Sequence, residues 1–402
     1  MSLNRDQSRV FEDAIYWYKS SSEQTFEISG PPGSGKTYLI NQIVSALNIP
    51  GAAIAPMAYT GAAAINMRNK GMCNAKTCYS WLYNKELIPV YDANGKQVMD
   101  PIYNKPVMKT KFIPKQKSDF KDIKLFIVDE GGSIPPEMRK DIDATGCKVL
   151  VAGDLDQLPP IFGEPGYLNT PDKVHCLNEV VRQSQNNSII LLSRLARDGK
   201  PIPHGYYGNV LVIYEDELTD KMIRDSQVII CSYNRTRDSM THYIRHNILG
   251  HRSELPEFGE RLVCRKNNWN IDEGSGINLT NGLLGNCVSM PGMIDTKTRT
   301  FELNFKPDMS MNTFTNLRCS FPYFNGDSNT RKHIKETTNF NIGELFEFGY
   351  SITTHMSQGS EFGNGIYIEE PIGNLGNKLN YVGLTRFKNF CIYVKRRPKN
   401  YR

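Results

Sequence analysis

Long apolar runs are missing from this sequence. No stretch approaches the ~20 consecutive apolar residues that a membrane-spanning helix needs. The first 20 residues also lack the apolar segment of a secretory signal peptide. We therefore expect neither a membrane span nor a secretory leader.

Metal-binding cysteine patterns are missing as well. The chain has nine cysteines, and the closest pair, Cys73 and Cys78, does not form a Cys-x-x-Cys motif. No Cys/His cluster has the spacing of a zinc site. Scattered cysteines of this kind are typical of reduced thiols, so we expect a cytoplasmic protein.

A strong excess of one charge is also absent. The net charge is +6 over 402 residues, with 39% hydrophobic and 22% charged residues. This mild basicity is compatible with a polyanionic partner but does not indicate one by itself. The length predicts two or three domains, and no internal repeat or low-complexity tract interrupts them.

A glycine-rich loop is the clearest feature that is present. "SGPPGSGKTYLI" (29–40) places Gly30 five residues before Gly35, which Lys36 and Thr37 follow. An apolar strand (25–30) precedes the loop and an amphipathic helix (36–47) follows it, which is the context that a phosphate-binding loop requires. Backbone N–H groups and a helix N-terminus then hold phosphates, Lys36 reaches the β/γ-phosphates and Thr37 binds Mg²⁺.

Alternating strands and helices predict the fold. Apolar strands at 51–56, 124–130 and 148–154 resemble buried parallel strands, and a second such series begins near 225–234 and returns at 346–355 and 390–395. We expect an α/β protein with parallel sheets. An Asn94-Gly95 turn between β-rich flanks predicts a hairpin within 84–120, and the loop-rich segment 263–340 predicts a small β-rich insertion.

Two further sites carry side chains suited to ATP hydrolysis. Asp129 and Glu130 end an apolar strand, where the first can hold Mg²⁺ and the second can activate the attacking water. Gln157 follows the strand that ends at Gly153-Asp154, and its amide can sense the γ-phosphate or that water. Without the phosphate loop, we would read the acids as surface charge and Gln157 as part of a polar loop.

Read in order, the motifs resemble those of superfamily 1 DNA helicases of the RecD-like, 5′-to-3′ branch. The matching segments extend from residue 3 to about 390: "LNRDQ" (3–7), "APMAYTGAAA" (55–64), "AKTCYSWL" (75–82), "LNEVVRQ" (177–183), "YSITTHMSQGSEF" (350–362) and "YVGLTRFKN" (381–389). The small phage members of the family are similarly compact, which fits a bacterial or phage-infected host cytosol.

The resemblance implies roles for individual residues. Its catalytic set is Lys36, Asp129, Glu130, Gln157, Arg182 and Arg386, of which the two arginines contact the γ-phosphate. Its ATP-binding set is Gln7, Gly30, Pro31, Pro32, Gly33, Ser34, Gly35, Lys36, Thr37, Gln358 and Glu361, with Gln7 on the adenine. Mg²⁺ is bound by Thr37 and Asp129, and the DNA-side candidates are Thr60, Tyr79, Trp81, Thr354 and His355.

The resemblance also implies a domain organisation and a function. Two RecA-like domains, 1–83 with 121–180 and 181–262 with 341–402, enclose ATP between them. The first carries the hairpin insertion 84–120, and the second carries an SH3-like insertion at 263–340. The implied activity is ATP-dependent 5′-to-3′ translocation on single-stranded DNA with duplex unwinding, in replication, recombination or repair. The implied state is a monomer, with a single-strand-binding protein or a replisome as partner.

The sequence departs from the family pattern in three places. The acidic motif continues with Gly131-Gly132-Ser133 instead of Ala-Ser, Tyr79 stands where the family has histidine, and Met356 replaces a lysine after His355. Tyr79 can still stack on a base, since any aromatic face serves. Trp81 and His355 are equally compatible with core positions. Tyr91 or Tyr103 of the hairpin is either a duplex-splitting wedge or an exposed tyrosine without a role.

Three other functions remain to be weighed against the helicase. A translocase that strips proteins from single strands needs the same motifs, so the sequence does not separate it from a helicase, nor DNA from RNA as the track. A P-loop kinase or small-molecule NTPase leaves the motifs after residue 177 unexplained. A purely structural binder does not account for the intact Lys36, Asp129, Glu130 and Arg386.

Overall fold

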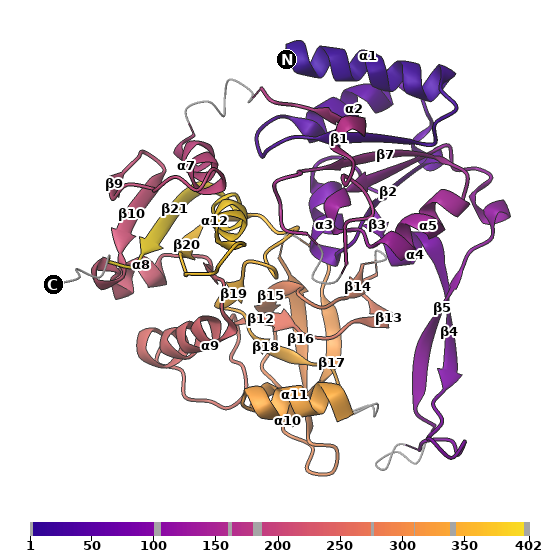
Figure 1. Cartoon of the computed structure of the whole chain (residues 1–402). Coiled ribbons are helices and arrows are strands. Elements are labelled where there is room, and N and C mark those ends of the chain that lie inside the picture. The colour runs from indigo at the N-terminus through magenta and orange to yellow at the C-terminus, as the bar shows by residue number, and fades with distance from the viewer. Residues whose placement is uncertain are drawn as a thin grey trace. The chain divides into compact units, whose positions relative to one another are not determined.

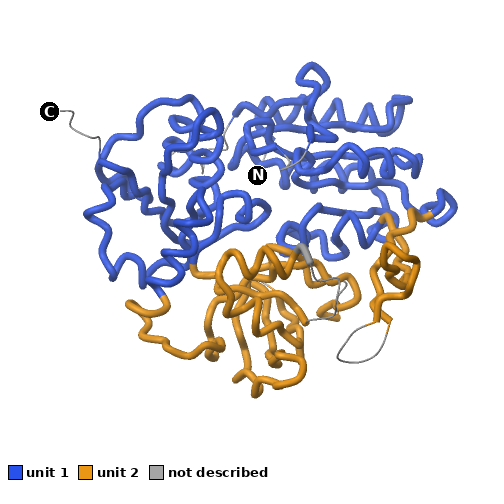
Figure 2. The backbone as a smooth tube through the Cα atoms, turned by 60° about the horizontal axis from the view of Figure 1, so that its bottom comes forward, with its two compact units in different colours: residues 1–81, 116–244, 351–402 blue, residues 82–115, 245–350 orange. Residues whose placement is uncertain are grey.

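The computed structural model describes residues 3–99, 106–159, 163–179, 187–274, 277–308, 310–337 and 343–397. The chain divides into two compact units (Figure 2). Unit 1 contains residues 1–81, 116–244 and 351–402, and unit 2 contains residues 82–115 and 245–350. Within the described ranges, no helix is long and apolar enough to cross a membrane.

The first lobe of unit 1 is built on a wholly parallel six-stranded sheet (Figure 1). Its strand order is β3-β2-β6-β7-β1-β8. The strands are β1 (Thr25–Ser29), β2 (Ile54–Ala58), β3 (Lys76–Thr77), β6 (Leu125–Asp129), β7 (Lys148–Gly153) and β8 (Val174–Cys176), and the helices are α1 (Arg5–Ser20), α2 (Lys36–Leu47), α3 (Gly61–Asn69), α4 (Cys78–Leu82) and α5 (Pro136–Ala144). Strand β2 is buried along its whole length, as expected of an apolar strand in a covered parallel sheet.

The second lobe of unit 1 repeats this plan. Its six-stranded sheet has the order β19-β11-β20-β21-β10-β9, and all pairs are parallel except β9 with β10. The strands are β9 (Gly205–Tyr206), β10 (Val210–Tyr214), β11 (Ile229–Cys231), β19 (Ser351–Thr353), β20 (Phe362–Ile368) and β21 (Phe387–Lys395), and the helices are α7 (Ser188–Arg197), α8 (Asp220–Arg224), α9 (Asn234–Tyr243) and α12 (Gly376–Leu384). The α/β fold with two parallel-type sheets is therefore confirmed.

Unit 2 is built from antiparallel strands. A five-stranded sheet has the order β17-β16-β15-β12-β18. Its strands are β12 (Arg261–Cys264), β15 (Leu284–Cys287), β16 (Thr300–Pro307), β17 (Phe314–Ser320) and β18 (Phe346–Phe348), accompanied by β13 (Asn268–Asp272), β14 (Asn278–Leu279), α10 (Phe321–Phe324) and α11 (Ser328–Thr337). The SH3-like character of this insertion stays a prediction, as do the domain boundaries given above.

The hairpin also belongs to unit 2. Strands β4 (Tyr83–Pro89) and β5 (Met108–Pro114) pair antiparallel and form a long ribbon (Figure 1). Gly95, at the turn, has φ +78°, a conformation that favours glycine. The ring of Phe112 packs edge-on against Trp269, with 5.3 Å between ring centroids. The hairpin therefore packs on the β13 segment within its own unit.

The segment 346–355 forms strands, as expected, but it is divided between the two units. It forms β18 in unit 2 and β19 in unit 1. Gly349 lies between them, and a Cβ there would approach the backbone of Leu262 to 2.9 Å. Because β12 pairs with β18, its backbone leaves no room for a side chain at Gly349. The sequence offered no signal for this beyond the glycine itself.

Candidate nucleotide site and nucleic-acid contacts

The functional side chains of the first lobe follow the carboxyl ends of its parallel strands. The phosphate loop follows β1, the acidic pair lies at the end of β6, and Asp154 follows β7. Neighbouring parallel strands bring these loops to one edge of the sheet, where ligands bind in open α/β sheets. The structure confirms a concave site there, with a cavity of about 260 Å³. Its lining includes Pro31, Pro32, Gly33, Gly35, Lys36, Thr37, Asp129, Glu130, Gln157, Glu361 and Arg386.

The phosphate loop has the backbone conformation that its glycines predict. Gly33 and Gly35 both have φ +80°, and Gly35 precedes the first residue of α2, Lys36. The Lys36 ammonium donates to the carbonyl oxygens of Gly30 and Pro31 and so lies over the loop. A Cβ on Gly30 would come within 2.5 Å of Ser34 Oγ. Gly30 and Ser34 therefore shape the loop from behind and do not line the cavity.

The acidic pair lies opposite this lysine. Asp129 is the last residue of β6, and its Oδ1 accepts a hydrogen bond of 3.0 Å from the Glu130 N–H. Glu130 has φ +54°, a left-handed conformation that costs energy for a residue with a side chain. Burial, together with the neighbouring Asp129 charge, raises the pKa of Glu130 above its ordinary value, while Arg386 and Lys36 act in the opposite direction. A raised pKa suits a carboxylate that takes a proton from water.

The second lobe contributes two charged residues to the same cavity. Arg386 is buried just after α12, where its guanidinium donates to the Val382 carbonyl at 3.2 Å and to Thr385 Oγ1 at 3.4 Å. Glu361 pairs with Lys70 of the first lobe at 2.7 Å and with Lys388 at 2.5 Å. Arginine and carboxylate from one lobe therefore share a cavity with the phosphate loop of the other.

Six residues that line the cavity were not predicted from the sequence: Tyr38, Ala63, Asn66, Lys70, Gly359 and Thr385. Asn66 and Lys70 lie at the end of α3. The Asn66 amide donates to the Gly359 carbonyl at 2.5 Å, so α3 holds the second-lobe segment that leads to Glu361. The sequence signal for Asn66 and Lys70 was weak, because Arg68 and Asn69 of the same segment are polar as well.

Two residues predicted to contact the nucleotide, Gln7 and Gln358, lie outside the lining of this cavity, and their contacts stay predictions. The Gln7 amide donates to the Ser34 carbonyl at 2.9 Å, and its oxygen accepts from the Asn4 N–H at 3.1 Å as part of the helix cap. Gln7 therefore ties α1 to the phosphate loop and is absent from the cavity lining. Gln358 also lies outside that lining, because its amide donates to the Leu158 carbonyl at 3.2 Å, beside Gln157.

The DNA-side candidates of the first lobe are partly accessible. Thr60 caps α3, and its hydroxyl accepts from the Ala63 N–H at 3.2 Å. Tyr79 is half-buried, with its ring centroid 6.4 Å from that of Tyr59, and burial raises its pKa to about 12. The Trp81 indole is also half-buried and donates to the Pro56 carbonyl at 2.8 Å.

The two candidates of the second lobe differ in their exposure, and the role of His355 stays a prediction. Thr354 is fully buried, and its hydroxyl donates to the Cys231 carbonyl at 3.1 Å. That hydroxyl is used inside the lobe, so we withdraw it as a phosphate contact. His355 is half-buried, and burial lowers its pKa. Arg182 and Tyr103 lie outside the described residues, so their predicted roles stay predictions.

The residues present fit a magnesium ion held together with ATP phosphates. In the described part of the chain, no three His, Cys, Asp or Glu side chains cluster into an all-protein metal site. Mg²⁺ in phosphate-loop enzymes needs no such cluster, since it takes one hydroxyl, one or two carboxylates, waters and the phosphates. Thr37 and Asp129 line the same cavity and would supply these oxygen ligands.

The two sheets and the shared cavity define a two-lobed P-loop NTPase. A family model described as an AAA domain matches residues 2–215, which is more than half of the chain. The chain belongs to this family. No curated protein matches it.

Solved helicase structures share its fold. Pif1 from Bacteroides bound to single-stranded DNA is similar with a TM-score of 0.55 at 18% identity, covering 98% of this chain and 92% of that one. Pif1 from Candida albicans has a TM-score of 0.51 at 15% identity, covering 99% and 95%. Bacteroides Pif1 with ADP-AlF3 and single-stranded DNA gives 0.55 at 16% identity, covering 98% and 92%. This likeness confirms the predicted fold of two RecA-like lobes.

Proposed function

We propose that this chain is an ATP-dependent DNA helicase that moves 5′-to-3′ along single-stranded DNA and unwinds duplexes. The observation that carries the proposal is the cavity lined by Lys36, Asp129 and Glu130 from one lobe and by Glu361 and Arg386 from the other. The similar Bacteroides protein is a helicase bound to single-stranded DNA. The direction of movement rests on the resemblance to the RecD-like branch.

Each side chain has a distinct part in hydrolysis. Lys36 and the loop N–H groups bind the phosphates, and Thr37 with Asp129 holds Mg²⁺, which neutralises phosphate charge when bound. Glu130 takes the proton of the attacking water, which Gln157 orients. Arg386 stabilises the charge of the transition state from the second lobe. Hydrolysis therefore requires the two lobes to be closed on each other.

One helix connects the candidate DNA-contact site to the nucleotide cavity. Helix α3 begins after Thr60, a candidate phosphate contact, and ends beside Asn66 and Lys70 in the nucleotide cavity. Gly359 of the second lobe lies against its start, where a Cβ would come within 2.9 Å of Thr60 Oγ1. A shift of the second lobe along α3 changes both ends together, which couples hydrolysis to movement on DNA.

The first experiment compares ATP hydrolysis with and without single-stranded DNA for the wild type and Lys36→Ala. We expect DNA to stimulate hydrolysis and Lys36→Ala to lose it. The same preparations are then tested on duplexes with a 5′ or a 3′ single-stranded tail, and we expect unwinding only from the 5′ tail.

Other outcomes have defined meanings. Stimulation without unwinding favours the protein-displacing translocase over the helicase. Hydrolysis that does not respond to DNA contradicts both. As part of the proposal, we place the protein in the cytoplasm as a monomer, with a single-strand-binding protein or a replisome as its partner. Sedimentation with and without DNA tests the monomeric state.

A further inference from the structure

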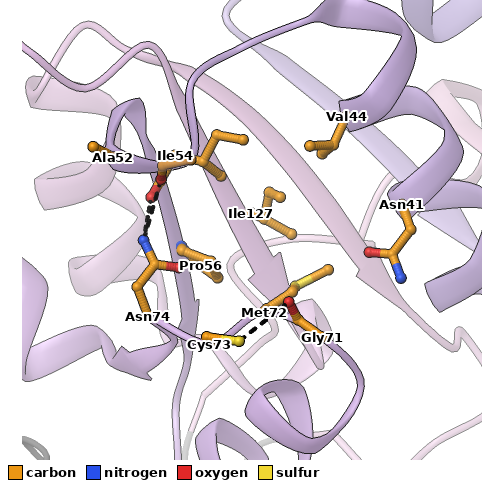
Figure 3. A pocket seen from close by; sticks show the side chains of 11 residues that line it. Asn41, Val44, Ala52, Ile54, Pro56, Gly71, Met72, Cys73, Asn74 and Ile127 are labelled. Carbon is orange, nitrogen blue, oxygen red and sulfur yellow. Dashed lines mark hydrogen bonds between the residues drawn. The ribbon is translucent and has the colours of Figure 1, made fainter.

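A second cavity lies in the first lobe, separate from the nucleotide cavity. It measures about 430 Å³, which is within the range of small-molecule sites. Figure 3 shows Asn41 and Val44 of α2 on one side, Ile54 and Pro56 of β2 on the other and Ile127 of β6 between them. The segment that follows α3, with Met72 and Cys73, closes one end.

The lining of this cavity selects an uncharged ligand. None of its lining residues carries a charge, and Ile54, Pro56 and Ile127 form a buried apolar floor. The polar side chains of the lining are the amides of Asn41 and Asn74 and the thiol of Cys73 at the rim. The Asn74 amide donates to the Ile54 carbonyl at 2.8 Å and is already engaged. A carboxylate or ammonium here would lose its hydration without gaining a partner.

Asn41 gives the cavity one hydrogen-bonding group. Its amide nitrogen donates to the Lys70 carbonyl at 3.5 Å, and the oxygen of the same amide points into the cavity (Figure 3). That oxygen can accept from an N–H or O–H of a ligand. The ligand class is therefore a small, mainly apolar ring with one donor.

The cavity is connected to the nucleotide site through two elements. Helix α2 carries Lys36 and Thr37 at its start and Asn41 and Val44 further along. Lys70 accepts from Asn41 through its carbonyl oxygen, while its ammonium pairs with Glu361 in the nucleotide cavity. A ligand that moves Asn41 therefore acts directly on the residue that joins the two lobes.

We propose that this cavity is a binding site for a small, uncharged, mainly apolar ring compound with one hydrogen-bond donor, and that its occupancy alters the nucleotide site. Indole, an apolar bicycle with one N–H, is the probe. The site itself does not depend on the proposed helicase activity, whereas its effect on ATP turnover does.

The test uses Cys73 as a reporter, since its thiol is exposed at the rim of the cavity. The full-length protein is alkylated with N-ethylmaleimide over time, and each cysteine is followed by peptide mass spectrometry. A ligand this small reaches a dissociation constant of about 1 mM. We expect ~5 mM indole to slow Cys73 alkylation about 6-fold. Cys176, half-buried elsewhere, should react unchanged.

Two controls make the test specific. Indole-3-carboxylate should not protect Cys73, because its charge has no partner in the lining. Val44→Phe fills the cavity and should abolish protection by indole. If Val44→Phe does not fold, Gly51→Leu replaces it, since a Cβ at Gly51 meets no atom within 4 Å. If indole does not protect Cys73 in the wild type, or still protects it in the cavity-filling variant, the proposed binding site is wrong.

ATP turnover is measured in the same samples. A change with indole that disappears in the filled variant supports the connection through Asn41 and Lys70. Protection of Cys73 without any change in turnover overturns that connection. Alkylation of Cys73 does not depend on ATP hydrolysis. If the protein shows no ATPase activity, the proposed function is contradicted, but the alkylation result still tests the binding site.

Discussion

The ammonium of Lys70 lies 2.7 Å from the carboxylate of Glu361, across the junction of the two lobes. The pair lines the nucleotide cavity and is partly buried. An ion pair at such a site contributes about 1 kcal/mol, or roughly 5-fold in an equilibrium. We expect Lys70→Met to raise the KM for ATP by about this factor with a smaller effect on kcat, and Lys70→Arg to retain most of the affinity. An unchanged KM in steady-state assays of Lys70→Met would contradict a role of Lys70 in ATP binding.

Glu361 makes folding stability depend on pH. Burial by itself would raise its pKa, but the charges of Lys70 and Lys388 outweigh burial and lower the pKa from 4.5 to about 2. A carboxyl group whose pKa falls on folding stabilises the native state above its unfolded pKa, and that stabilisation disappears as pH falls through the folded value. We therefore expect Glu361 to stabilise the protein at neutral pH and to lose this effect between pH 4.5 and pH 2.

The measurement is the urea midpoint against pH for the wild type and Glu361→Gln. The difference in urea midpoint between the wild type and Glu361→Gln should be constant at neutral pH and should decrease below about pH 4.5. Parallel curves down to the acid limit of folding would contradict the assigned pKa.

The Tyr381 hydroxyl donates to Asp154 Oδ2 at 2.5 Å, and both side chains are buried. This bond joins α12 of the second lobe to the end of β7 in the first. Burial raises the pKa of Asp154, so the charged form of its carboxylate relies on the hydrogen-bond donors around it for stabilisation. We expect Tyr381→Phe to destabilise the protein by about 2 kcal/mol. Denaturation of Tyr381→Phe, Asp154→Asn and the double variant should yield a coupling energy; strictly additive effects would mean that the bond contributes nothing.

Gly131 explains one departure from the helicase pattern, which has alanine after the acidic pair. A Cβ at Gly131 would lie 2.3 Å from Val151 Cγ1 in the neighbouring strand. Gly131→Ala should cost about 1–3 kcal/mol through overpacking. Gly132→Ala is the matched control, because a Cβ there meets nothing within 4 Å. Thermal unfolding measures both, and Val151→Ala should relieve the penalty. Equal unfolding temperatures for the two alanine variants would contradict this account.

Tyr79 is the predicted base-stacking residue of the first lobe. Its ring is half-buried beside Tyr59, and burial raises its pKa to about 12, so its hydroxyl stays protonated at neutral pH. Loss of a stacking ring costs about 1–3 kcal/mol per base. We expect Tyr79→Ala to weaken single-strand binding by at least about 5-fold and Tyr79→Phe to preserve it. Fluorescence anisotropy at fixed salt gives both affinities; equal loss in both variants would point to the hydroxyl instead.

Local sequence was enough to predict the elements that carry the nucleotide chemistry. The glycine spacing, the apolar strand before it and the helix after it placed Lys36 and Thr37 correctly, because a short loop between a strand and a helix has few possible conformations. Asp129 and Glu130 were predicted for a similar reason, since the carboxyl ends of parallel strands meet at one edge. Gln157 and Arg386 entered the cavity as expected.

Contacts between distant segments could not be predicted in this way. The amides of Gln7 and Gln358 donate to the backbone carbonyls of Ser34 and Leu158, which the sequence did not predict. Their contacts with the nucleotide stay predictions. Thr354 was expected on DNA, but the Cys231 carbonyl of the adjacent strand accepts its hydroxyl. A buried polar group bonds to whichever partner packing brings to it, and the sequence does not record that partner.

The sequence by itself therefore determined the class of fold and the phosphate-loop half of the site, because both depend on local patterns of glycine, apolar strands and strand-end acids. Only the tertiary structure decided which residues join the two lobes. Three residues, Lys70, Asn66 and Tyr381, form hydrogen bonds of 2.5 to 2.7 Å across the lobes. Their partners lie about 230 to 290 positions away in the sequence. Such pairs depend on how two sheets close on each other, which is a property of packing and not of any segment alone.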